Sequence, residues 1–280
     1  MKLRRLAPVI VAFGALAQGA VAVCAAETNV VQFTQPAPYS SDEELGRRFG
    51  YGVLPQGYDI SGERFRIEVP PTGPTNTTFG LLVWLSPGDD AVFPPVWQDE
   101  LARHEFILVL PLNCGDERNP ADRLRLALDA TCNACRKYRI DRKRIYIGGY
   151  AGGARLASML GIACSDIFTG TLCVGGVGFH LHVVVTGNQY YPGSFYPNPQ
   201  LVEQARTKEG FVLITGEGDP NFELIKVVAE KGFRRDGFKR VLLLQAPGIG
   251  QTPPEPGTLN QALVFLEKGD IPTSQPLTRK

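Results

Sequence analysis

The sequence predicts a single α/β domain built on a doubly wound, mostly parallel sheet. Short apolar segments with the length of buried strands alternate along the chain with segments of helical periodicity, as such a sheet requires. The turn Gly149-Tyr150-Ala151-Gly152-Gly153 supports this prediction, because it joins an apolar segment to a helical segment of small residues. Glycines on both sides of Ala151 permit a sharp turn and a close approach of strand and helix. The chain of 280 residues, less a predicted leader, suits one domain of this kind.

Residues 1–26 have the pattern of a secretory signal peptide. Lys2, Arg4 and Arg5 precede an apolar run, and small residues at its end suit cleavage before Glu27. The run is too short for a membrane span, and no later segment is apolar for long enough. We therefore expect a secreted or periplasmic protein. Its predicted parts are an N-terminal extension over 27–62, the α/β domain over 63–269 and a flexible tail over 270–280.

The mature chain has no basic excess. Loss of the leader removes three basic residues and leaves 26 Lys and Arg against 28 Asp and Glu. A net charge near −2 gives no electrostatic reason to bind nucleic acid or an anionic membrane. We expect a small molecule, a polymer or another protein as the partner, and we expect no cofactor and no metal ion.

Caps and hydrophobic periodicity predict the first elements of the chain. The capping pattern Ser41-x-x-Glu44 signals a short helix over Asp42–Phe49. Alternating apolar residues predict a strand over Phe65–Val69. The continuous apolar run Phe79–Leu85 predicts a strand that is covered on both faces.

The later elements alternate to the end of the domain. Asn119-Pro120 combines an N-cap with a proline at the first helical position, so it opens a long helix to about Tyr138. The span Gly178–Arg206 is aromatic and irregular, and we expect it to cover one end of the sheet. The other predicted strands are Phe106–Leu110, Arg144–Gly148, Gly170–Val174, Phe211–Thr215 and Arg240–Leu244. The other predicted helices are Trp97–His104, Ala154–Leu160, Phe222–Phe233 and Thr258–Glu267.

Five cysteines remain after the leader, so at least one is unpaired or pairs between molecules. Cys132 and Cys135 share a helical stripe with two leucines, which favours buried thiols over a redox or metal site. Cys164 and Cys173 flank a helix-to-strand connection, which makes them the candidate pair for a disulfide in an oxidising compartment.

The turn at Ala151 has the context of a nucleophile elbow but lacks the nucleophile. A G-x-S-x-G elbow consists of a strand, a tight turn and a helix, and its serine attacks an ester or amide carbonyl. The acid and the base of such a site follow on loops at the carboxyl ends of later strands. Asp219, just beyond the strand Phe211–Thr215, is the candidate acid. The loop after the last strand carries Gln251, and no histidine follows His182 in the chain.

Over Phe65–Leu266 the chain resembles the secreted polyhydroxybutyrate depolymerase/esterase branch of the α/β-hydrolases. The resemblance rests on Leu81–Leu85, on the run Ile140–Gly149 that leads into the turn, and on Pro247–Gly250. Within the run, the residues Ile140-Asp141-Arg142-Lys143-Arg144-Ile145-Tyr146 are similar to a pattern typical of that branch.

The resemblance implies an α/β-hydrolase fold and a degenerate catalytic triad. It implies that Ala151 occupies the serine position, Asp219 the aspartate position and Gln251 the histidine position. The branch usually has His-Gly where this chain has Ser86-Pro87-Gly88. A proline there removes a backbone N–H that an oxyanion would need.

Candidate ligand-binding residues lie on the loops around this turn. We expect Ser86, Tyr150, His180, His182 and Tyr191 to contribute to a retained cleft. Alternation places the two histidines on one side, which would suit a metal ion or a displaced base, but hydrogen bonding within the loop is the favoured interpretation. The aromatic residues over 188–197 either bind a ligand or hold the loop against the sheet.

Three functions remain open from the sequence. The first is a secreted pseudohydrolase that binds a ligand or partner in the old cleft. The second is an active esterase or depolymerase with a relocated nucleophile, for which Ser86, Ser158 or Ser194 would pair with His180 or His182. The third is a structural extracellular module with an exposed apolar patch.

Overall fold

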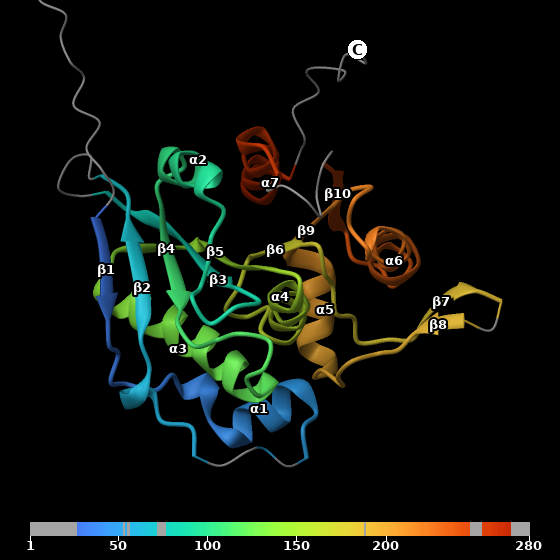
Figure 1. Cartoon of the computed structure of the whole chain (residues 1–280). Helices are drawn as coiled ribbons and strands as arrows, with labels where there is room; N and C mark the ends of the chain where they lie inside the picture. The colour runs from blue at the N-terminus through green and yellow to red at the C-terminus, as the bar shows by residue number, and fades with distance from the viewer. Residues whose placement is uncertain are drawn as a thin grey trace, which may run out of the picture.

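The computed structural model describes residues 27–52, 54, 57–71, 77–187, 189–246 and 254–269. An eight-stranded sheet runs through the molecule in the order β1-β2-β4-β3-β5-β6-β9-β10 (Figure 1). β2 is antiparallel to both of its neighbours, and the remaining neighbours in the sheet are parallel. The strands are β1(Glu27–Val31), β2(Phe65–Val69), β3(Phe79–Leu85), β4(Phe106–Pro111), β5(Ile140–Tyr150), β6(Gly170–Val174), β7(Val183–Thr186), β8(Gln189–Tyr191), β9(Gly210–Thr215) and β10(Arg240–Gln245).

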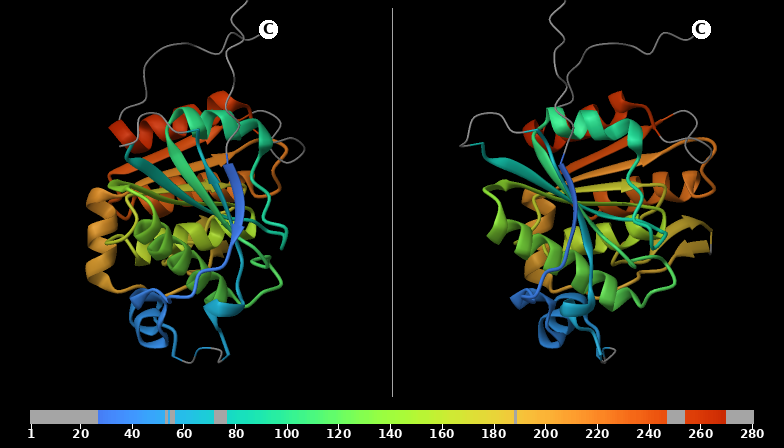
Figure 2. Two further views of the ribbon diagram at one scale, coloured as in Figure 1. Left: turned by 90° about the vertical axis from the view of Figure 1, so that its left-hand side faces the viewer. Right: turned by 60° about the vertical axis from the view of Figure 1, so that its left-hand side comes forward.

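Helices cover both faces of the sheet, so the predicted doubly wound α/β architecture is confirmed. α2 and α7 lie on one face, and α3 and α4 lie on the other (Figure 2). No described helix is both long enough and apolar enough to span a membrane. The helical segments are η1(Pro38–Ser40), α1(Asp42–Phe49), η2(Ile60–Gly62), η3(Pro95–Trp97), α2(Gln98–Arg103), α3(Pro120–Lys137), α4(Gly152–Ala163), α5(Pro199–Lys208), α6(Phe222–Val227), the π-helical η4(Val228–Arg234) and α7(Pro256–Lys268).

β3 lies near the centre of the sheet and is buried along its whole length. Leu81, Val83 and Leu85 join the hydrophobic cluster under α3 and α4, whereas Leu82 and Trp84 join the cluster under α2 and α7. A continuous apolar run is what a parallel strand covered on both faces needs. The sequence interpretation of Phe79–Leu85 is therefore confirmed.

The segment 27–62 is attached to the rest of the molecule through a buried carboxylate of α3. Oδ1 of Asp129 accepts hydrogen bonds from the backbone N–H of Ala37 at 2.5 Å and from Oγ of Ser40 at 2.7 Å. Its Oδ2 accepts a hydrogen bond from the Tyr58 hydroxyl at 2.6 Å. Three donors from two separate stretches of the segment thus converge on one side chain, and β1 adds an edge strand beside β2.

A second attachment joins α1 to the carboxyl end of α4. The guanidinium of Arg48 is buried and binds Asp166 with two hydrogen bonds of 2.6 and 2.8 Å. It also donates to the carbonyl of Ala163 at 3.3 Å and to Glu44 at 3.0 Å. Paired, bidentate contacts of this kind are the geometry that stabilises a buried arginine.

The span Gly178–Arg206 is more regular than the sequence analysis predicts. It contains the antiparallel hairpin β7–β8 and most of α5, whose N-cap is Asn198. The hairpin projects from the body beside α6 (Figure 1). The expectation of an irregular segment is therefore wrong, because two short strands pair to form the hairpin and the N-cap Asn198 begins α5.

The five cysteines among the described residues are free thiols. Cys164 and Cys173, the candidate disulfide pair, are buried separately and do not bond to each other. Cys132 and Cys135 are half-buried and pack against the core on the α3 face, as expected of thiols that act as small apolar residues.

Replacement of Arg48 should test the attachment of α1. We expect Arg48→Ala to lower the free energy of unfolding by about 2–3 kcal/mol, because it removes charge-assisted hydrogen bonds from a buried site. The matched control is Arg47→Ala on the same helix, since Arg47 binds the same Glu44 from an exposed position. Its expected cost is less than about 0.5 kcal/mol. Urea denaturation measures both, and equal costs would show that Arg48 does not anchor the helix.

Candidate functional site

The turn between β5 and α4 has a strained backbone at its middle residue. Ala151 has φ 50° and ψ −113°, a conformation that residues other than glycine rarely adopt. Its N–H donates to the carbonyl of Val174 at 2.8 Å, and its carbonyl accepts the N–H of Arg155 at 3.2 Å. Hydrogen bonds to β6 and to α4 thus hold residue 151 at the carboxyl edge of the sheet.

Glycines allow the backbone segments to meet at this turn. A Cβ on Gly149 would lie 2.7 Å from the carbonyl oxygen of Leu85, and one on Gly153 would collide with that same carbonyl. A Cβ on Gly176, in the loop after β6, would collide with the carbonyl oxygen of Ala151. The close approach that the glycine pattern predicts is therefore present between β3, β5, β6 and α4.

Asp219 and Tyr150 lie beside each other near Ala151. A Cβ on Gly175 would be 3.5 Å both from Oδ2 of Asp219 and from the ring of Tyr150, so the two side chains flank that residue. The Asp219 carboxylate is buried and accepts hydrogen bonds from Oγ1 of Thr215 at 2.7 Å and from the N–H of Asn221 at 2.8 Å. Tyr150 is 37 % exposed, so part of its side chain is accessible to solvent beside the turn.

The loop after β3 is closed by hydrogen bonds of its own. Oγ of Ser86 accepts the N–H of Val92 at 3.0 Å and donates to the carbonyl of the same residue at 3.3 Å. The Ser86 side chain is buried, and its backbone carbonyl accepts a hydrogen bond from Arg123 at 3.1 Å. Ser86 therefore stabilises the loop and presents no free hydroxyl.

The two histidines of the loop after β6 do not share a side, so the expectation from alternation is wrong. The side chain of His180 is 7% exposed and lies among Phe179, Phe195 and Phe238, with Nε2 3.3 Å from Asp236. His182 is exposed on the approach to the hairpin. Its Nδ1 accepts the N–H of Gly193 at 3.1 Å, and its ring meets Tyr190 edge to face. No strand runs through 180–182, so a period of two does not apply there.

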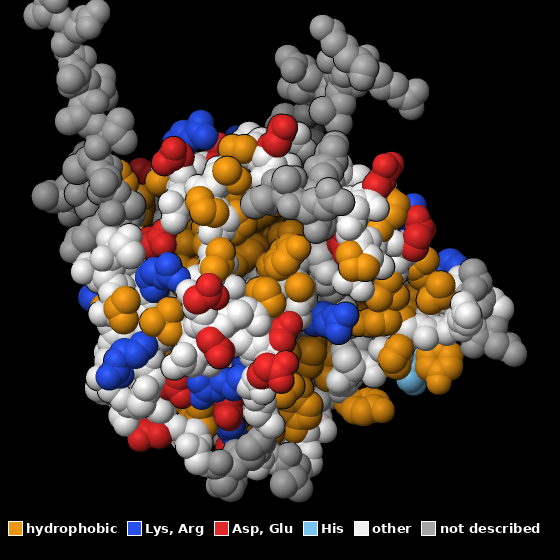
Figure 3. Space-filling view, in the orientation of Figure 1, with side chains coloured by type: hydrophobic (Ala, Val, Ile, Leu, Met, Phe, Trp, Pro, Cys, Tyr) orange, Lys and Arg blue, Asp and Glu red, His pale blue; other side chains and the backbone are white. Residues whose placement is uncertain are grey.

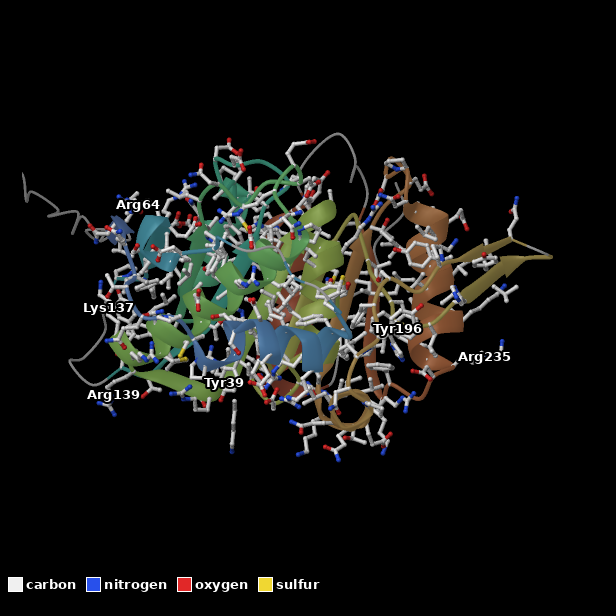
Figure 4. The ribbon with its side chains drawn as sticks, turned by 90° about the horizontal axis from the view of Figure 1, so that it is seen from below. Tyr39, Arg64, Lys137, Arg139, Tyr196 and Arg235 are labelled. Carbon is white, nitrogen blue, oxygen red and sulfur yellow. The ribbon has the colours of Figure 1, made fainter. Side chains whose placement is uncertain are left out.

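The aromatic residues over 188–197 are spread over separate surroundings. Tyr191 is half-buried and donates its hydroxyl to the carbonyl of Val177 at 2.7 Å. Tyr196 is 79 % exposed and lies beside the end of α1, where its N–H donates to the carbonyl of Phe49 (Figure 4). Tyr190 is exposed on the hairpin. These side chains therefore do not form one aromatic wall over the turn.

No serine pairs with a histidine within hydrogen-bond distance in the described ranges. Ser158 is buried in α4, where it donates to backbone carbonyls of its own helix and accepts the N–H of Gly178 at 2.7 Å. Ser194 donates to the carbonyl of Phe179 at 3.2 Å. His104, at the end of α2, interacts with Asn260, Glu100 and Glu267 on the far layer.

Cys114 is a further potential nucleophile at this edge, and its surroundings make it inert. The side chain is fully buried just beyond β4. Burial raises the pKa of the Cys114 thiol to about 11, although the guanidinium of Arg123 opposes this shift. A thiol with such a pKa is protonated at neutral pH and is not a thiolate nucleophile.

Gln251 lies outside the described residues, as do the leader and the tail 270–280. In the part of the chain that the structure describes, no cluster of three His, Cys, Asp or Glu side chains has the arrangement of a metal site.

A cavity of about 570 Å³ lies on the α3 flank between η1 and η2. None of the expected site residues lines it; its wall includes Pro38, Ser40, Tyr58 and Arg125.

Two residues that the sequence analysis did not single out lie directly at the turn. Asp116 follows β4, and a Cβ on Gly152 would collide with its carboxylate. Arg123 of α3 is buried and donates to Asp116 at 2.8 Å. The sequence could have indicated both residues as candidates for the site, because they lie on the segment that follows β4. Loops that follow parallel strands converge at one edge of a sheet.

The fold of the chain is similar to the folds of solved esterases and serine hydrolases. A fungal esterase of Rhizomucor miehei matches with a TM-score of 0.57 at 14% identity, over 89% of this chain and 84% of that chain. A fluorophosphonate-binding serine hydrolase of Staphylococcus aureus matches with a TM-score of 0.55 at 9% identity, over 87% and 99% of the two chains. A ferulic acid esterase matches with a TM-score of 0.51 at 16% identity, over 86% and 98%.

The chain has an α/β-hydrolase fold. No protein-family model matches the sequence, and no curated protein matches it. Within the α/β-hydrolase fold, Ala151 lies at the β5–α4 turn and Asp219 lies on the loop after β9.

His180 should make stability fall in acid. Burial lowers the pKa of His180 below its usual range, and Asp236 opposes that shift. The unfolded chain takes up this proton near the ordinary pKa of about 6.5, whereas the folded chain takes it up only at lower pH. Acid therefore favours unfolding through this group.

We expect the free energy of unfolding of the unmodified protein to fall more steeply between pH 7 and pH 5 than that of His180→Phe. His182→Phe is the matched control, since His182 is an exposed histidine of the same loop. Denaturant titrations at several pH values measure the difference. A His180→Phe profile parallel to that of the unmodified protein would contradict the assignment.

Proposed function

We propose that this protein is an exported α/β-hydrolase-like protein that lacks serine-hydrolase catalysis and binds a ligand or partner. The observation that carries the proposal is Ala151 at the β5–α4 turn, with φ 50°, where an α/β-hydrolase presents its nucleophile. A methyl group has neither a lone pair for attack nor a proton for a base to remove. The proposal places Ala151 at the position of the lost serine.

Loss of the base is the second part of the proposal. Gln251 would stand where the catalytic histidine follows the last strand, and an amide does not act as a general base near neutral pH. Asp219 would remain at the acid position, with both carboxylate oxygens already engaged by Thr215 and Asn221. An acid that orients no histidine has no role in a triad.

A relocated nucleophile is the alternative, and the described contacts speak against it. The hydroxyl groups of Ser86, Ser158 and Ser194 each donate a hydrogen bond to a backbone carbonyl. Activation of a serine needs a base within about 2.6–3.2 Å of it, and neither His180 nor His182 makes such a contact within the described part of the chain.

For the ancestry of the protein we propose the secreted polyhydroxybutyrate depolymerase/esterase branch. The run Ile140–Gly149, which carries the sequence resemblance, forms most of β5 and leads directly into the turn. The solved neighbours support a hydrolase fold and do not separate this branch from other esterases. Tyr150, exposed beside Gly175, is the first residue that we would expect a ligand at the turn to contact.

Ester turnover tests the proposal. We expect purified mature protein to hydrolyse short-chain p-nitrophenyl esters no faster than buffer, and a serine-directed fluorophosphonate to leave it unlabelled, because the turn carries no hydroxyl. An Asp219→Asn variant serves as the matched control. Turnover that Asp219→Asn abolishes would overturn the proposal by revealing a working site.

Turnover that persists in Asp219→Asn would point to the relocated site instead. Replacement of both His180 and His182 by alanine then decides, since the alternative requires one of them as its base. If the protein shows no ester turnover, thermal-shift screening with candidate ligands separates a ligand-binding protein from a structural module. A bound ligand raises the melting temperature.

A further inference from the structure

The carboxylate of Asp116 lies against the first residue of α4. A Cβ added to Gly152 would collide with both carboxylate oxygens and with the carboxyl carbon of Asp116. The backbone N–H of Asp116 donates to the carbonyl of Pro87 at 2.8 Å, which ties the loop after β4 to the loop after β3. The position of this carboxylate is therefore set by backbone contacts on both sides.

Arg123 holds the carboxylate from the interior. Its side chain is 4 % exposed, and it donates from Nη1 to Oδ1 of Asp116 at 2.8 Å and from Nη2 to the carbonyl of Ser86 at 3.1 Å. Oδ2 of Asp116 accepts no hydrogen bond from any described residue, and the side chain is 43 % exposed. One carboxylate oxygen is thus fixed by the buried guanidinium, while the other has no described hydrogen-bond partner.

The amino end of α4 suits a negative charge. Unpaired N–H groups and the helix dipole make a helix N-terminus electropositive, which stabilises an anion placed there. In a serine hydrolase, the N–H of the residue after the nucleophile binds the oxyanion of the tetrahedral intermediate. Gly152 is the residue after Ala151. The carboxylate of Asp116 therefore lies beside the residue whose N–H would bind such an oxyanion.

The surroundings add to the negative charge. Asp89 and Glu117 are exposed on the loops after β3 and β4. Glu117 follows Asp116 in the chain, and Oδ1 of Asp89 accepts the N–H of Gly115 at 2.8 Å. Acidic side chains gather in the middle of the face that Figure 3 presents, with patches of Lys and Arg beside them. Arg118, two residues after Asp116, forms an ion pair with Glu63.

We propose that Asp116 fixes a negative charge beside the oxyanion position, and that it makes the turn accept neutral or cationic groups and reject carbonyl oxyanions. This inference rests on the proposed function, since it names the class of ligand that the old site would take. It also makes the loss of hydrolysis independent of residue 151. A negative charge fixed at Gly152 opposes the oxyanion even if a nucleophile is supplied.

The charge at the turn can be measured without catalysis. In an Ala151→Cys variant, the new thiol reacts with an anionic reagent, 2-sulfonatoethyl methanethiosulfonate, and with a cationic one, the 2-(trimethylammonio)ethyl analogue. The ratio of the two rates reports the local potential, because any change in the thiolate fraction affects both reagents alike. The unmodified protein, whose five mature-chain cysteines are buried or half-buried, supplies the background rate.

We expect the cationic reagent to react faster, and Asp116→Asn in the Ala151→Cys background to shift the ratio towards the anionic reagent by about tenfold or more. Asp99→Asn, which removes an exposed charge from α2, is the matched control and should leave the ratio unchanged. A shift no larger for Asp116→Asn than for Asp99→Asn would overturn the proposal.

A double-mutant cycle tests the same contact if Ala151→Cys does not fold. We expect Gly152→Ala to lower the melting temperature by about 4 °C or more in the native background and to be tolerated in an Asp116→Ala background, because the clash is with that carboxylate. Gly153→Ala should be costly in both backgrounds, since its clash is with the carbonyl of Leu85. Equal costs of Gly152→Ala in the two backgrounds would overturn the proposal. Ester turnover by the unmodified protein would overturn the proposed function, whereas the thiol rates and the melting temperatures test the contact between Asp116 and Gly152 independently of turnover.

Discussion

Backbone contacts at the β5–α4 turn are the constraint on which the arrangement of the site depends. A Cβ on Gly149 would lie 2.5 Å from the carbonyl carbon of Gly153, and neither residue has room for one beside Leu85. β3, β5 and α4 can therefore meet only where side chains are absent. Because the parallel strands all end at this edge, the loops after β3, β4, β6 and β9 are brought around residue 151.

Much of the fold follows from local sequence signals. Phe79–Leu85 and Gly170–Val174 are strands over the predicted residues, and Asp42–Phe49 is a helix over the predicted residues, because burial pattern and caps decide them locally. α5 carries the same signal as α3: Asn198-Pro199 repeats the cap and first-turn proline of Asn119-Pro120. That helix was available to sequence reasoning and was missed because aromatic residues surround it.

Other features depend on partners that are distant in the chain. β1 is short and has a polar start, and only its pairing with β2 makes it a strand. The convergence of Tyr150 and Asp219 follows from strand order, so the sequence predicted it. The position of Asp116 depends on a buried arginine of the next helix and on a carbonyl of another loop. No spacing along the chain contains that information.

The conformation of Ala151 depends on the backbone and not on the side chain. Its φ of 50° is held by the hydrogen bond that its N–H donates to Val174, by the one that its carbonyl accepts from Arg155, and by the neighbouring glycines. None of these contacts involves the side chain. Substitutions at 151 can therefore accumulate while the backbone of the turn persists. Descent from an esterase would therefore remain recognisable in the backbone conformation of the turn long after the reaction itself had been lost.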